Sequence, residues 1–140
     1  FKQCCLLNSQ QALPIIRALI EIHGQSDWEQ FCVILLNSKN EVIGLNIVAT
    51  GTISSAQVSP REVLKPAILA NAAAMILCHN HPSGDVYPSA EDQALTEMIV
   101  KAAAIIGIQI HEHLIVSMTD DQYYSFADNG IIRNICQTIG

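Results

Sequence analysis

The chain has 140 residues, half of them hydrophobic, which suits one domain with a buried core. Seven Lys and Arg stand against thirteen Asp and Glu, for a formal net charge of −6, so the composition provides no basic stripe for binding nucleic-acid phosphates. No apolar run reaches the length of a membrane span, and no signal peptide is visible. We therefore expect no membrane partner and no direct nucleic-acid contact by this fragment. We expect a single domain over residues 1–140. Because the first residue is Phe1 rather than Met, we expect this domain to be excised from a longer chain.

The cysteines indicate a reducing compartment. There are five of them, an odd number with irregular spacing, at Cys4, Cys5, Cys32, Cys78 and Cys136. This pattern argues against a disulfide framework, and Cys32 and Cys78 fall inside apolar runs. We therefore expect a cytoplasmic protein. The Cys4–Cys5 pair suits a metal or redox role, but terminal or packed thiols are the simpler interpretation.

The first half of the chain predicts one helix and an antiparallel strand pair. Apolar residues at helical spacing predict a helix over 11–23. The continuous apolar run 31–36 predicts a strand covered on both faces. After a polar turn at 37–40, residues 42–50 predict an antiparallel return strand. Residues 51–60 predict a loop or a short strand.

The second half predicts two more helices and two more strands. Their ranges are helix 61–73, strand 74–78, helix 90–106 and strand 108–117. Pro66 is expected to kink the first of these helices or to shift its start, and Gly107 to end the second. A short segment follows at 123–126, and no element is predicted for the tail from Asp128. The order α-β-β-α-β-α-β predicts an α/β fold of the α+β type, with a mixed sheet flanked by helices.

Two histidines follow the predicted strand 74–78. His79 and His81 are two residues apart on extended backbone, so their imidazoles point to the same side. Asp92 lies in the first turn of the next predicted helix and can supply a third ligand. Three such ligands leave one tetrahedral position of a zinc ion for water. The pattern therefore predicts a catalytic zinc site at His79, His81 and Asp92.

Other interpretations of these polar residues compete with the metal site. Ser89 and Asp92 also fit a helix start, with Ser89 as the N-cap and an acidic first turn favoured by the helix dipole. The metal interpretation is preferred because two histidines leaving a buried strand need a metal or carboxylates to satisfy them. His111 and His113 form a second i, i+2 pair. We interpret His111 as solvent-facing and His113 as a partly buried residue behind the metal ligands.

A zinc hydrolase also needs a group that takes a proton from water. Glutamates near strand ends are the candidates, namely Glu29, Glu41, Glu62 and Glu91. Glu29 is preferred because it begins the strand expected at the centre of the sheet. From the residues alone, a solvated glutamate at a strand entry is the simpler account of Glu29.

The motif His79-x-His81-Pro82-x6-Ser89-x2-Asp92 resembles the JAMM (MPN+) metalloprotease signature at every defined position. The stretch from His79 to Asp85, with Pro60-Arg61-Glu62-Val63 before it and His113-Leu114-Ile115-Val116 after it, is similar to the bacterial RadC-like branch of that family. The resemblance covers residues from about 5 to 132.

The resemblance implies a function and a role for each site residue. His79, His81 and Asp92 would be zinc ligands, Ser89 would donate a hydrogen bond to the oxyanion, and Glu29 would be the general base. The implied fold is JAB/MPN-like, a curled mixed sheet flanked by helices with cytidine-deaminase-like architecture. JAMM enzymes cleave peptide or isopeptide bonds, so the implied partner is a peptide or protein substrate. RadC-like proteins also carry a DNA-repair label.

The resulting hypothesis is a zinc-dependent hydrolase of peptide or isopeptide bonds. Two alternatives stay open: a non-catalytic binding domain that retains a metal site, and an accessory domain in DNA repair or recombination. A deaminase fits less well, because its layout places a Glu two residues after the ligand His and adds a Cys-x-x-Cys, and this sequence has neither. The sequence leaves the substrate and the oligomeric state open.

Overall fold

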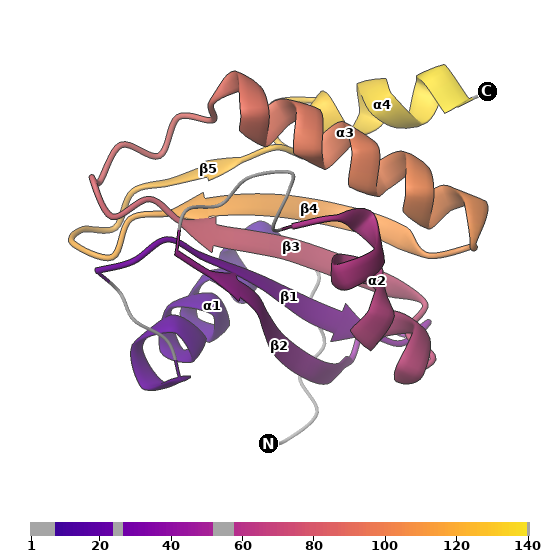
Figure 1. Ribbon diagram of the computed structural model, residues 1–140, viewed down its shortest axis with the longest axis horizontal. Helices are drawn as coiled ribbons and strands as arrows, with labels where there is room; N and C mark the ends of the chain where they lie inside the picture. The colour runs from indigo at the N-terminus through magenta and orange to yellow at the C-terminus, as the bar shows by residue number, and fades with distance from the viewer. Residues whose placement is uncertain (1–7, 24–26, 52–57, 140) are drawn as a thin grey trace.

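The computed structural model describes residues 8–23, 27–51 and 58–139. In this part of the chain a five-stranded mixed sheet, in the order β2-β1-β3-β4-β5, lies between helices on its two faces (Figure 1). The elements are α1 Ser9–His23, β1 Gln30–Leu36, β2 Val42–Thr50, α2 Pro60–Leu69, β3 Ala74–Asn80, α3 Ala90–Ile105, β4 Gln109–Val116, β5 Tyr123–Ser125 and α4 Ile131–Ile139. The predicted mixed sheet flanked by helices is confirmed.

The pairing of the strands brings the start of β1 and the ends of β3 and β4 to one end of the sheet. β3 runs parallel to β4 and antiparallel to β1. Every residue of β1 and of β3 is buried, as the continuous apolar runs predicted. Because β1 is antiparallel to β3, Phe31 near the start of β1 pairs with His79 near the end of β3. β3 is the central strand, and β1 is interior beside it.

The sheet has an apolar core on each face. On one face, α1 packs Ala12, Ile16 and Ile20 against the strands, all fully buried. On the other face, α2, α3 and α4 cover the sheet, with residues such as Val63 and Ile99 fully buried. Full burial of an aliphatic side chain contributes roughly 1.5–3 kcal/mol. These two layers fix the strand ends that carry the site.

The helix predicted over 11–23 begins earlier, at Ser9, and both ends of the helix predicted over 61–73 need correction. The helix predicted over 61–73 is α2, which starts at Pro60 behind the N-cap Ser59 and ends at Leu69. Pro66 lies inside it, so the start is set by the N-cap and not by Pro66. The helix stops early because Asn71 takes a left-handed φ of 55°, and the chain then turns into β3. The stop predicted at Gly107 is confirmed, with a φ of 79° just beyond α3.

The tail from Asp128, for which the sequence predicts no element, forms α4. Gly130, with a φ of 76°, leads into this helix, and Ile132 and Ile135 are buried against α3 and β4. The short predicted segment at 123–126 contains β5, which pairs with the last residues of β4.

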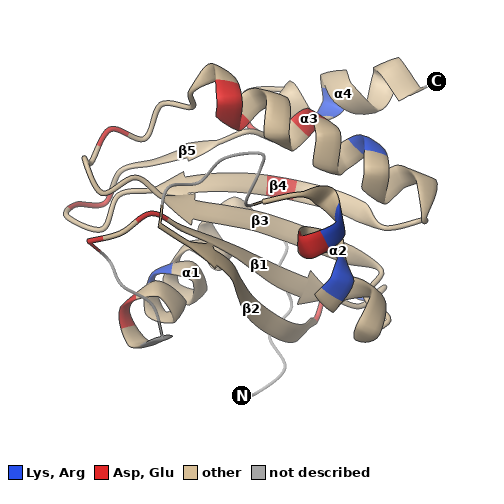
Figure 2. Ribbon diagram, in the orientation of Figure 1, with Lys and Arg blue, Asp and Glu red and all other residues tan. Residues whose placement is uncertain are grey.

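Figure 2 shows how the charges are distributed over the described residues. The described Lys and Arg lie on each of the helices α1, α2, α3 and α4, and Lys39 lies in the turn between β1 and β2 (Figure 2). No helix in the described ranges has both the length and the apolar character needed to cross a bilayer. The Cys4–Cys5 pair and residues 52–57 of the predicted connection lie outside the described residues.

Candidate metal centre

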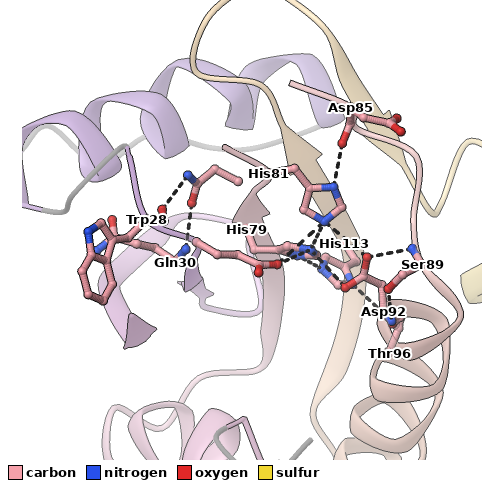
Figure 3. Close-up of polar contacts among 11 residues, drawn as sticks. Trp28, Gln30, His79, His81, Asp85, Ser89, Asp92, Thr96 and His113 are labelled. Carbon is pink, nitrogen blue, oxygen red and sulfur yellow. Dashed lines mark hydrogen bonds and ion pairs between the residues drawn. The ribbon is translucent and has the colours of Figure 1, made fainter. Parts of the chain in front are cut away.

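The imidazoles of His79 and His81 converge at the end of β3. Their Nε2 atoms lie 3.1 Å apart (Figure 3). The carboxylate of Asp92, in the first turn of α3, faces both rings: Oδ1 is 3.3 Å from Nε2 of His79, and Oδ2 is 3.3 Å from Nε2 of His81. The predicted same-side projection of the two histidines and the approach of Asp92 are both present in the structure.

The spacing of these atoms fits a metal ion. Zinc holds His nitrogen and carboxylate oxygen at about 2.0–2.2 Å, so neighbouring ligand atoms in a tetrahedron lie about 3.4 Å apart. The observed separations are 3.1–3.3 Å. With Glu29 included, each of four residues offers a ligand atom within 4.8 Å of the others. The cluster could therefore hold a divalent cation.

Glu29 lies slightly farther out than the other three groups. Its Oε1 is 3.8 Å from Nε2 of His81 and 4.0 Å from Nε2 of His79. Separations beyond 3.5 Å between polar groups leave room for a bridging water. The position of Glu29 thus suits a group that acts on a water at the cluster, although it can also be a ligand.

The side chain of Asn80 fixes the backbone on both sides of Glu29. Asn80 Oδ1 accepts the N–H of Gln30 at 2.8 Å, and its Nδ2 donates to the carbonyl of Trp28 at 2.9 Å. Asn80 is fully buried, and in the sequence it lies between His79 and His81. Asn80 was not among the residues predicted for the site. Its position at the end of a buried strand is the available signal, because a buried amide needs both a hydrogen-bond donor and an acceptor as partners.

Ser89 and Asp92 close the start of α3 as a capping box. The helix-start interpretation of these residues is therefore confirmed, and the same Asp92 also faces the histidines. Burial disfavours a charged carboxyl, but the imidazoles of His79 and His81 and the N–H of Ser89 outweigh it. Together they hold the pKa of Asp92 well below its usual value. Asp92 is thus ionised and ready to bind a cation.

His81 presents a bare Nε2 to the cluster when neutral. Its Nδ1 lies 2.7 Å from the backbone carbonyl of Asp85, and a carbonyl can only accept, so Nδ1 carries the hydrogen. Burial disfavours its charged form, but Asp92, the Asp85 carbonyl and Glu29 outweigh burial, and the pKa of His81 is raised. Asp85 therefore contributes its backbone carbonyl to the site.

His113 lies directly behind His79. Its Nε2 is 2.8 Å from Nδ1 of His79, and it is fully buried, more deeply than the sequence suggested. Burial, with the neighbouring His79 imidazole, lowers the pKa of His113 well below its usual value. A β-bulge at His111 turns that residue outward, where its Nε2 lies 3.0 Å from Oδ1 of Asn40. The two histidines of this pair therefore have unrelated surroundings.

The remaining glutamate candidates lie outside the cluster formed by the described residues. Glu41 bonds to Asn37 in the turn before β2, Glu62 is exposed beside Arg61 on α2, and Glu91 is exposed in the first turn of α3. Of the four glutamates considered, the structure brings only Glu29 to the histidines.

The fold and the cluster together are those of a JAB/MPN-like domain. Residues 6–131 match the family model described as RadC-like JAB domain, and the chain belongs to this family. It is 49% identical over 126 residues to a UPF0758 protein of Rubrobacter xylanophilus, covering 85% of this chain and 54% of that protein. It is 49% identical over 104 residues to UPF0758 protein STH371 of Symbiobacterium thermophilum, with 74% and 44% coverage. Against UPF0758 protein YeeS of Escherichia coli the identity is 45% over 104 residues, with 74% and 69% coverage. The chain thus spans about half the length of the first two relatives, and these names state no activity.

Proposed function

We propose that this domain is a zinc-dependent hydrolase of peptide or isopeptide bonds, with His79, His81 and Asp92 as the zinc ligands. The observation that carries the proposal is the convergence of two imidazole nitrogens and one carboxylate within 3.1–3.3 Å of each other. When both Nε2 atoms are bare, their lone pairs and the carboxylate repel one another at this separation, and a cation between them turns the repulsion into attraction. The donor set of two His and one carboxylate is that of known catalytic zinc sites.

In this proposal the zinc site and Glu29 have different roles in hydrolysis. Zinc bound at the cluster would supply an acidified water and polarise the carbonyl of the scissile bond. Glu29 acts as the general base, taking the proton from the attacking water and giving it to the leaving amine. Its place just outside the histidine and aspartate atoms suits this role.

Ser89 would stabilise the oxyanion that develops during attack. Its Oγ accepts the N–H of Asp92 at 3.0 Å, which leaves its own hydroxyl hydrogen for donation. A single well-placed donor of this kind contributes roughly 3 kcal/mol to transition-state stabilisation.

A hollow beside Glu29 supports the proposal, because it offers a place where a substrate could lie next to the general base. It has a volume of about 280 Å³ and is lined by Asp27, Trp28, Glu29, Gly51 and Pro82. Trp28 is half exposed there, and an aromatic surface next to a catalytic group suits contact with an extended polypeptide.

The test is a cleavage screen of peptide and isopeptide-linked libraries with the zinc-loaded protein. We expect cleavage that chelation abolishes and zinc restores. Glu29→Gln should lose cleavage, because the amide is similar in shape but cannot accept the proton. Glu62→Gln, at the exposed glutamate on α2, is the matched control and should cleave like the parent. Full activity of Glu29→Gln would remove Glu29 from the mechanism. Zinc binding without any cleavage would favour the non-catalytic metal-binding alternative.

A further inference from the structure

A buried line of polar contacts runs from the metal cluster into the core. Nδ1 of His79 is 2.8 Å from Nε2 of His113, and Nδ1 of His113 is 2.6 Å from Oγ1 of Thr96. The Thr96 hydroxyl in turn donates to the backbone carbonyl of Asp92 at 2.7 Å (Figure 3). His79, His113 and Thr96 are each 0% exposed. The line thus starts at one predicted ligand and ends on the backbone of another.

The directions of these hydrogen bonds follow from the last contact. A carbonyl oxygen only accepts, so the single hydrogen of the Thr96 hydroxyl lies toward Asp92. Thr96 Oγ1 must then accept from His113, which places a hydrogen on Nδ1 of His113. A buried imidazole favours its neutral form, so Nε2 of His113 is bare and accepts from Nδ1–H of His79. When both imidazoles are neutral, only this arrangement makes all three contacts attractive.

We propose that Thr96 and His113 are positioning residues that hold His79 in the tautomer with a bare Nε2 aimed at the metal cluster. The proposal rests on the metal site proposed above. In the opposite tautomer, a hydrogen on Nε2 would occupy the position that the cation takes. The hydroxyl of Thr96 therefore selects the tautomer of His79 that can bind a cation, and it does so through the ring of His113, which lies between them.

Packing prevents the intermediate ring from turning out of line. His113 stacks flat on Phe126, with ring centroids 4.4 Å apart and an interplanar angle of 10°. Phe31 meets the same ring edge-on at 5.6 Å and stacks on His79 at 5.7 Å. The bulge at His111 in β4 puts His113 on the sheet face that carries His79, since His113 pairs with Leu77. Backbone and aromatic packing together set the geometry of the line.

The two predicted histidine ligands differ in what holds them, and this difference makes the proposal testable. His81 is oriented by the backbone carbonyl of Asp85, which no substitution removes. His79 is oriented by side chains only. A substitution at Thr96 should therefore change the tautomer of His79 and leave the tautomer of His81 unchanged.

The direct test is two-bond ¹H–¹⁵N NMR of metal-free protein under alkaline conditions where the imidazoles are neutral. We expect hydrogen on Nδ1 and a bare Nε2 for both His79 and His113 in the wild type. Thr96→Val keeps the side-chain shape and removes the hydroxyl, so it should give mixed tautomers at both rings. Thr96→Ser restores the hydroxyl and should restore the wild-type spectrum. Hydrogen on Nε2 of His79 in the wild type would overturn the proposal even if Thr96→Val does not fold.

The second readout is zinc affinity, measured by competition with a chromophoric chelator. Loss of a residue that orients a ligand histidine costs about 10- to 100-fold in metal affinity, so Thr96→Val should weaken binding by that factor and Thr96→Ser by much less. Equal affinity and unchanged spectra in Thr96→Val would contradict the proposal while leaving the zinc site intact. A wild type that binds no zinc would instead contradict the proposed function, and the NMR spectra would still decide which tautomer Thr96 selects.

Discussion

Ser89 and Asp92 bond to each other in both directions at the start of α3. The Oγ of Ser89 accepts the N–H of Asp92 at 3.0 Å, and Oδ2 of Asp92 accepts the N–H of Ser89 at 2.9 Å. The same Oδ2 lies 3.3 Å from Nε2 of His81. The helix cap and the metal cluster therefore share the carboxylate of Asp92. A substitution at this cap changes both helix stability and the cluster, so its effect has to be compared with the same substitution at the N-cap of another helix.

Ser89→Ala should affect both stability and catalysis. Loss of the cap should lower the free energy of unfolding by about 1 kcal/mol, measured by urea denaturation. Loss of the hydroxyl should also lower kcat of any hydrolysis by about 100- to 1,000-fold. Ser59, the N-cap of α2, accepts from the N–H of Glu62 and provides the control. Ser59→Ala should lose comparable stability and keep its activity, whereas equal activity in the two variants would remove Ser89 from the reaction.

Asn80→Ala should impair hydrolysis without removing the metal. Without this amide, the backbone at Trp28 and Gln30 loses two hydrogen bonds, so Glu29 between them is no longer held. A misplacement of about 1 Å in a catalytic group can cost about 100-fold in rate. We expect a fall of that size in kcat with zinc content unchanged, measured below the melting temperature. Asn134→Ala, at an exposed position of α4, is the control. Unchanged kcat in Asn80→Ala would show that Glu29 is positioned by other contacts.

The histidines of the site were predictable because a simple rule governs them. On extended backbone the side chains alternate, so His79 and His81 had to share a side. The same rule is wrong for His111 and His113, because a β-bulge at His111 breaks the alternation. Bulges depend on the pairing of neighbouring strands, which a single sequence does not reveal. The contacts of Asn80 with residues some 50 positions away are hidden for the same reason.

The missed helix at the end of the chain has a different cause. Residues 131–139 contain Ile131, Ile132, Ile135 and Ile139, a spacing that fits one face of a helix. Isoleucine is β-branched and favours strands when judged by composition alone. The burial of Ile132 and Ile135 against α3 and β4 decides in favour of the helix, and this packing partner is known only from the fold.

Glu112 presents a separate prediction, about stability. This carboxylate is buried on the α1 side of the sheet and links α1, β4 and the start of the connection to α4. Its oxygens accept four hydrogen bonds, from the hydroxyls of Ser9 and Ser125 and from the N–H groups of His113 and Ala127.

Glu112→Gln should destabilise the domain by about 3 kcal/mol. The amide nitrogen replaces an acceptor by a donor, so at least one buried donor loses its partner, and a hydrogen bond to a charged group contributes about 1.5–3 kcal/mol. Urea denaturation with tryptophan fluorescence from Trp28 measures the change. Glu97→Gln provides the control, because Glu97 forms an exposed pair with Lys101 on α3 and should cost about 0.5 kcal/mol or less. Equal losses in the two variants would show that Glu112 is not a structural link.

We expect no salt-dependent binding of DNA by this domain. DNA affinity depends on Lys and Arg that neutralise phosphates, and log K falls by about 0.9 per neutralised phosphate for each tenfold rise in salt. The chain has seven basic and thirteen acidic residues, and the described basic residues lie on four helices and, for Lys39, in the turn between β1 and β2 (Figure 2). A fluorescence anisotropy titration with duplex and single-stranded DNA at low and moderate salt is the measurement. Micromolar binding that weakens steeply with salt would favour the DNA-repair accessory alternative over the hydrolase.

The most direct test of the account is the zinc stoichiometry and affinity of the purified protein, measured by isothermal titration calorimetry. We predict one zinc ion per chain for the wild type, and binding that is lost in His81→Ala and strongly weakened in Asp92→Asn. Glu29→Gln should retain the zinc, because Glu29 lies beyond the ligand atoms at 3.8–4.0 Å. A wild-type protein that binds no zinc, or a His81→Ala variant that binds it as tightly as the wild type, would contradict the proposed metal centre.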